Sequence, residues 1–99
     1  MEKQKILIAD DSEMNRALLV DILENQYDIV EADNGAAAID LLTQCGGNFS
    51  LLLLDIMMPE MDGFEVLAYI NRYHLNDTLA VIMILSLIHI SEPTRRSYI

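Results

Sequence analysis

Short apolar segments alternate with segments of helical character along this chain, and that alternation limits the fold more than any other feature. We predict strands over Lys5–Asp10, Tyr27–Ala32, Phe49–Asp55 and Leu79–Ile84, and helices over about Glu13–Asn25, Ala36–Gln44 and Phe64–His74. Continuous apolar runs of this length are typical of strands covered on both faces. Alternation at this spacing implies parallel strands with right-handed crossovers. The sequence therefore predicts one α/β domain with a doubly wound parallel sheet.

The first predicted helix has an apolar stripe. Met14, Leu18 and Ile22 recur at helical spacing, and Ala17 and Leu19 widen the stripe, which is the pattern of a helix with one apolar side. Asp11 or Ser12 precedes the stripe and can cap the helix by accepting a backbone hydrogen bond.

Composition restricts the partners and the location of the chain. Its 99 residues have a net charge of −10, from 16 acidic and 6 basic residues. Direct nucleic-acid binding is disfavoured, because phosphate contacts need a basic face. Cys45 is the only cysteine, so no internal disulfide can form, which fits a reducing compartment. The apolar run Leu79–Ile90 is shorter than the roughly 20 residues of a membrane span. We expect a cytoplasmic location and no membrane segment.

Three carboxylates stand at the ends of predicted strands. Asp10 and Asp11 close the first strand, and Asp55 closes the third. Ligands of open parallel sheets bind outside the carboxyl ends of the strands, so these acids would converge if the two strands are neighbours. Crowded carboxylates repel one another unless a cation compensates, and Mg²⁺ prefers oxygen ligands. An aspartate can also act as a nucleophile towards phosphorus. The pattern indicates metal-assisted phosphoryl transfer.

Two sequence motifs resemble one known family. The segment "ILIADDSEMNR" together with "LLLLDIMMPEMDGFEVL" is similar to the receiver domain of bacterial two-component response regulators, over about residues 3–84. The resemblance implies a flavodoxin-like fold with strand order 2-1-3-4-5. It also implies phosphorelay signal transduction, in which the domain is a regulatory phosphoacceptor rather than an enzyme.

The resemblance assigns roles to the acidic residues. Asp55 would accept a phosphoryl group from a phosphohistidine of a sensor histidine kinase or a histidine phosphotransfer protein. Mg²⁺ would be bound directly by Asp11 and Asp55, by the backbone carbonyl of Met57, and through water by Asp10.

The resemblance also assigns roles outside the acidic cluster. Pro59 and Gly63 would shape the loop that leads into the third helix. The exposed face of the first helix, around Asn15, would meet the phosphodonor protein. The output module that such a domain controls is not encoded in these residues.

The chain departs from the family pattern after the fourth predicted strand. Position 85 should hold a Ser or Thr but is Leu85, and Ser86 comes one residue late, which turns a strand side chain to the opposite face. A matching Lys, a fifth strand and a fifth helix are also missing from the pattern. The tail "LSLIHISEPTR" resembles a translated sequencing adapter. We therefore predict a receiver domain over residues 3–84 and a non-native tail over residues 85–99.

Other classes of protein fit less well. A haloacid-dehalogenase-like phosphatase would have a second Asp at the position of Met57. A dinucleotide-binding domain would have glycines after the first strand, where this chain reads "ADDSEMN". Two alternatives stay open, namely a phosphorylation-independent interaction module and a non-functional fragment.

Overall fold

The computed structural model describes residues 3–44, 49–58, 60–74 and 79–84. They form β1 (Lys5–Ala9), α1 (Glu13–Leu23), β2 (Asp28–Ala32), α2 (Gly35–Gln44), β3 (Phe49–Asp55), α3 (Gly63–Arg72) and β4 (Ala80–Ile84). Every described element matches a predicted one within a few residues. None of the helices in these ranges has the length and apolar character that crossing a membrane requires.

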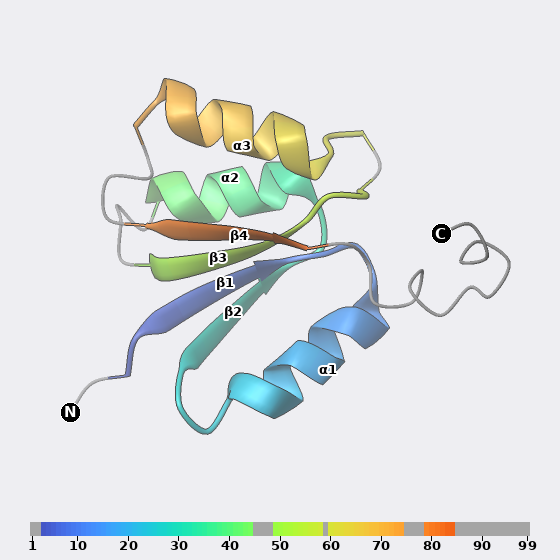
Figure 1. Cartoon of the computed structure of the whole chain (residues 1–99), viewed down its shortest axis with the longest axis vertical. Helices are drawn as coiled ribbons and strands as arrows, with labels where there is room; N and C mark the ends of the chain where they lie inside the picture. Colours follow the sequence, from blue (N-terminus) through green and yellow to red (C-terminus); the bar gives the residue numbers. More distant parts are fainter. Residues whose placement is uncertain (1–2, 45–48, 59, 75–78, 85–99) are drawn as a thin grey trace, which may run out of the picture.

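The four strands form one parallel sheet in the order β2-β1-β3-β4. β1 and β3 lie side by side at its centre, with Ile8 opposite Leu53 and Ala9 opposite Leu54. Figure 1 shows α2 and α3 on one face of the sheet and α1 on the other. This arrangement confirms the predicted doubly wound, flavodoxin-like fold within the described residues.

Each face of the sheet has its own apolar core, which explains the continuous apolar runs. Leu7, Leu52 and Leu54 point towards α2 and α3 and are completely buried there. Ile6 and Ile8 point the other way, towards α1. Since both faces of β1 are covered, four of its five residues are buried, as expected for the interior strand of a parallel sheet.

The predicted orientation of α1 is wrong. Met14, Leu18 and Ile22, called the α1 stripe below, are 70%, 47% and 63% exposed. Asn15, expected on the exposed face, is only 2% exposed. The buried side of α1 instead contributes a second set of apolar residues, which pack against Ile6, Ile8 and Leu53: Leu19, Val20 and Leu23. Because α1 has apolar residues on two sides, periodicity could not decide which side faces the sheet.

Local side-chain chemistry sets both ends of α3. The Asp62 carboxylate accepts from the Glu65 amide, and the Glu65 carboxylate accepts from the Asp62 amide, which forms a capping box. The helix ends at Arg72, two residues earlier than predicted, because His74 has a φ of 56° in the left-handed region. His74 is exposed at this end of α3.

Candidate metal centre

Three carboxylates meet at the carboxyl edge of the sheet. Asp55 is the last residue of β3, and Asp10 and Asp11 directly follow β1. Their candidate ligand oxygens all lie within 4.8 Å of one another. The pairing of β1 with β3 explains this convergence, because parallel neighbours end at the same edge. Asp10 and Asp55 are 1% and 0% exposed, whereas Asp11 is exposed.

The Asp10 carboxylate is held from two directions. Its Oδ1 accepts from the Ser12 backbone N–H at 2.9 Å, and its Oδ2 accepts from the Asn15 side-chain amide at 3.3 Å. Its backbone is fixed as well, since its carbonyl accepts from the Arg16 guanidinium at 2.8 Å and its N–H donates to Ala32 at 3.0 Å. Asp10 therefore has a defined position although it is a buried anion.

The two oxygens of Asp55 differ in their surroundings. Oδ1 accepts from the Met57 backbone N–H at 3.2 Å. Oδ2 is buried and has no hydrogen-bond partner among the described residues. Burial raises the pKa of Asp55 from 3.8 to about 6; the nearby charges of Asp10 and Asp11 add to the rise, and the Met57 hydrogen bond opposes it. A buried carboxylate oxygen without a donor is costly, so this site favours a compensating positive charge.

The donor set fits a hard divalent cation. Three carboxylates supply oxygen ligands, which Mg²⁺ and similar ions prefer. The unpaired oxygen of Asp55 and the exposed carboxylate of Asp11 are the two groups left free for such contacts by the hydrogen bonds described above. Met57 is held beside Asp55 by its own N–H, and the role of its carbonyl stays a prediction.

Gly63 lies against the backbone of Asp55. Its N–H donates to the carbonyl of Ile56 at 3.0 Å. A Cβ at Gly63 would lie 2.5 Å from the Asp55 carbonyl oxygen and 2.8 Å from the Ile56 Cα. The loop can approach β3 this closely only because glycine has no side chain, which supports the expected loop-shaping role. Two other predicted site residues, Pro59 and Ser86, lie outside the described residues.

Sequence reasoning missed the contributions of Asn15 and Arg16. Asn15 shares its side of the helix with Leu19 and Leu23, which follow it by four and eight residues, but the α1 stripe offered an equally apolar alternative. A helix oriented with Leu19 and Leu23 towards the sheet also places Asn15 beside Asp10. No comparable signal linked Arg16 to Glu31 on β2, to which it is paired at 3.0 Å.

A family comparison agrees with this geometry. The family model for the response regulator receiver domain matches residues 6–97 of the chain. The chain belongs to this family. Receiver domains are regulatory components of two-component systems, and the acidic cluster of this receiver domain occupies the carboxyl edge where its fold places ligands.

Two relatives share substantial sequence identity with this receiver domain. The response regulator receiver protein CpdR of Brucella abortus is 44% identical over 64 residues, which are 65% of this chain and 52% of CpdR. The response regulator TrrA of Thermotoga maritima, solved in complex with Mg²⁺-BeF, is 32% identical with a TM-score of 0.74. That match covers 95% of this chain and 75% of TrrA. The chain spans about half the length of CpdR.

A third similar structure extends the fold comparison. The receiver domain of Saccharomyces cerevisiae Ssk1, crystallised with the histidine phosphotransfer protein Ypd1, has a TM-score of 0.73. The match covers 83% of this chain and 63% of that one, at 20% identity. At this identity the likeness concerns the fold.

Proposed function

We propose that this receiver domain accepts a phosphoryl group on Asp55 from a phosphohistidine of a sensor histidine kinase or a histidine phosphotransfer protein. The observation behind the proposal is the buried, unpaired Oδ2 of Asp55 among three carboxylates. TrrA, which is 32% identical, was solved in complex with Mg²⁺-BeF, and this supports Mg²⁺ as the cation. Phosphorylation would then switch an output module in the cytoplasm.

The residues of the site suit this transfer. The ionised Asp55 carboxylate attacks phosphorus through one oxygen, an O–P bond forms, and the N–P bond of the phosphohistidine breaks, which leaves the electron pair on the imidazole. Asp11 and Asp55, with the Met57 carbonyl and, through water, Asp10, would hold Mg²⁺. The ion would neutralise charge on the phosphoryl oxygens. The Met57 N–H keeps Oδ1 of Asp55 in place, which fixes the orientation of the carboxylate that reacts.

The test uses acetyl phosphate as a small phosphodonor with Mg²⁺ and the unmodified chain. We expect intact-protein mass spectrometry to detect the addition of one phosphoryl group, and chelation of Mg²⁺ to prevent it. Asp55→Asn keeps the shape of the side chain and should not be modified. Undiminished labelling of Asp55→Asn would refute the site. A wild-type chain that binds no phosphoryl group would favour the interaction module or the non-functional fragment.

The α1 stripe is the surface that we propose for the protein phosphodonor. It lies on the helix that begins beside the acidic cluster, and its three apolar side chains are exposed. Apolar side chains in such a row suit the side of a partner helix. This assignment replaces the one around Asn15, which is buried.

Two serine variants test the α1 stripe. Leu18→Ser removes an apolar side chain from the stripe, while Ala17→Ser changes an exposed neighbour outside it. With a purified phosphorylated histidine phosphotransfer protein as donor, we expect about tenfold slower transfer to Leu18→Ser, the usual size of a hot-spot effect. Ala17→Ser should behave like the wild type. Both should be labelled normally by acetyl phosphate, and slower labelling of Leu18→Ser by acetyl phosphate would contradict a role in docking.

A further inference from the structure

The first turn of α1 contacts Asp10 at three points. Ser12 donates its N–H to one carboxylate oxygen, Asn15 donates its side-chain amide to the other, and Arg16 donates to the carbonyl. Both carboxylate oxygens of Asp10 therefore already accept a hydrogen bond. Rotation of this carboxylate would break at least one of them.

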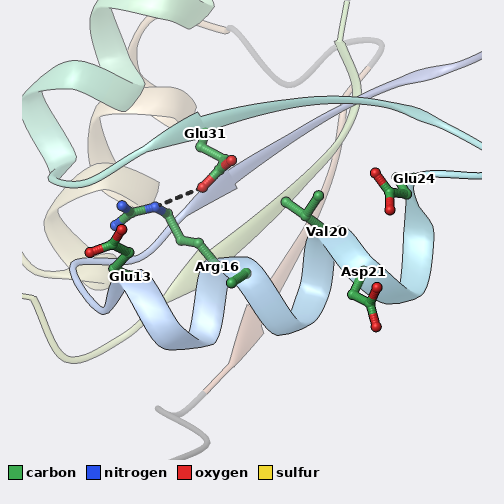
Figure 2. A pocket seen from close by; sticks show the side chains of 7 residues that line it. Glu13, Arg16, Val20, Asp21, Glu24 and Glu31 are labelled. Carbon is green, nitrogen blue, oxygen red and sulfur yellow. Dashed lines mark hydrogen bonds and ion pairs between the residues drawn. The ribbon is translucent and has the colours of Figure 1, made fainter.

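An ion pair between a half-buried arginine and an exposed glutamate links this turn of the helix to the sheet. Figure 2 shows Arg16 extending from α1 to Glu31 on β2, with 3.0 Å between Nε and Oε1. The Arg16 side chain is only 15% exposed. Because Arg16 also donates to the Asp10 carbonyl, it joins the end of β1, the start of α1 and the end of β2. Asn15, one residue earlier, is held in the same turn.

Asn15 is a polar residue at a buried position, so its presence there needs a physical explanation. Asn15 is 2% exposed and shares its side of the helix with Leu19 and Leu23, so an apolar residue would satisfy packing there. Burial of a primary amide is unfavourable unless its groups are hydrogen-bonded. The contact with Asp10, at 3.3 Å, is a hydrogen bond to a charged group, which is stronger than a neutral one.

We propose that Asn15 is a positioning residue of the cation site, which fixes the Asp10 carboxylate so that Asp10 contributes through water while Asp11 and Asp55 bind the ion directly. This inference rests on the proposed function. Two observations support it. Each carboxylate oxygen of Asp10 already accepts a hydrogen bond from the protein. Asp11, in contrast, is exposed, and Asp55 keeps an oxygen without a hydrogen-bond partner among the described residues.

The test compares two variants of the same helix. Asn15→Leu keeps the approximate size of the side chain and removes the donor to Asp10. Ala17→Ser changes an exposed side chain two residues later and leaves the three contacts with Asp10 in place. Mg²⁺ affinity of the unphosphorylated chain is measured by isothermal titration calorimetry. We expect Asn15→Leu to weaken it about ten- to hundredfold, as for other residues that orient metal ligands, and Ala17→Ser to leave it unchanged.

Two further measurements distinguish positioning from a general loss of structure. In acetyl phosphate labelling, Asn15→Leu should raise the half-saturating Mg²⁺ concentration and leave the rate at saturating Mg²⁺ nearly unchanged. In an Asp10→Asn background, Asn15→Leu should have little further effect on Mg²⁺ affinity, because the group through which it acts has changed. If Asn15→Leu does not fold, Asn15→Ser takes its place in both experiments.

The outcomes separate the inference from the proposed function. Wild-type Mg²⁺ affinity in the folded Asn15 variant, or an equal loss in Ala17→Ser, would overturn the positioning role. A wild-type chain that neither binds Mg²⁺ nor reacts with acetyl phosphate would instead overturn the proposed function itself.

Discussion

Asp55 is the residue on which the ionisation of the site depends. One of its oxygens has a hydrogen-bond donor and the other is buried without one among the described residues. Its pKa of about 6 lies above the ordinary value of 3.8. The folded chain without a cation thus favours the protonated form of this side chain more than the unfolded chain does.

The raised pKa of Asp55 predicts how stability depends on pH. Between about pH 4 and pH 6 the folded chain retains a proton that the unfolded chain has released, so this stabilisation is complete below pH 4 and disappears as the pH rises through 6. The loss is on the order of 2–3 kcal/mol. Asp55→Asn lacks the titrating group, so the difference in unfolding free energy between the two proteins should shift in favour of Asp55→Asn across this range. Urea denaturation at pH 4 and 7 measures it, and a pH-independent difference would contradict the prediction.

The contact of Gly63 with Asp55 predicts that Gly63→Ala lowers the stability of the folded chain. Helix propensity alone would make Gly63→Ala more stable, by up to about 1 kcal/mol. The added Cβ would instead meet the Asp55 carbonyl oxygen at 2.5 Å, and overpacking of this kind costs about 1–3 kcal/mol. We expect a lower midpoint in urea denaturation. A higher midpoint would mean that the loop can move away without cost.

At the scale of the elements, the carboxyl end of α3 stores backbone strain. His74 follows the C-cap residue Tyr73 and has a φ of 56°, a position where glycine is the usual residue. His74→Gly should raise the unfolding free energy by up to about 1 kcal/mol, because a side chain in this conformation is unfavourable. His74→Ala removes the same exposed imidazole and keeps the Cβ, so it should give no such gain. Thermal denaturation followed by circular dichroism compares the two variants.

The sequence predicted the elements well for a physical reason that also explains its failures. Strands covered on both faces need unbroken apolar runs, and the carboxyl ends of parallel neighbours share an edge, so the positions of Asp10, Asp11 and Asp55 followed directly. The orientation of α1 did not follow, since both of its sides offer apolar residues. The end of α3 depends on a positive φ at His74 that no glycine signals.

On the scale of the whole molecule, β4 and α1 both expose apolar side chains among the described residues. β4 pairs with β3 so that Ile82 lies opposite Leu53, on the sheet face that α1 covers. Ile82 is 48% exposed, and the α1 stripe is exposed on the helix that lies on this face of the sheet (Figure 1). Exposed apolar side chains are a common site of association.

The exposed Ile82 and α1 stripe lead us to expect self-association of the 99-residue chain. Sedimentation equilibrium should detect a mean mass that rises with protein concentration. Ile82→Thr keeps a β-branched side chain for the strand but reduces the exposed apolar area, and should lower this association. A wild-type chain that stays monomeric at all concentrations would contradict the prediction.

The pairing of β1 with β3 also determines when the site can exist. Residues 10–48 separate these two strands along the chain, and this segment includes α1, β2 and α2. Bringing the two strands together costs chain entropy before any contact between them compensates. Asp10 follows β1 and Asp55 ends β3, so a cation shared between them would stabilise the pairing of the two strands. During synthesis from the N-terminus, Asp10 and Asp11 would emerge early and would gain their third carboxylate only once β3 is complete.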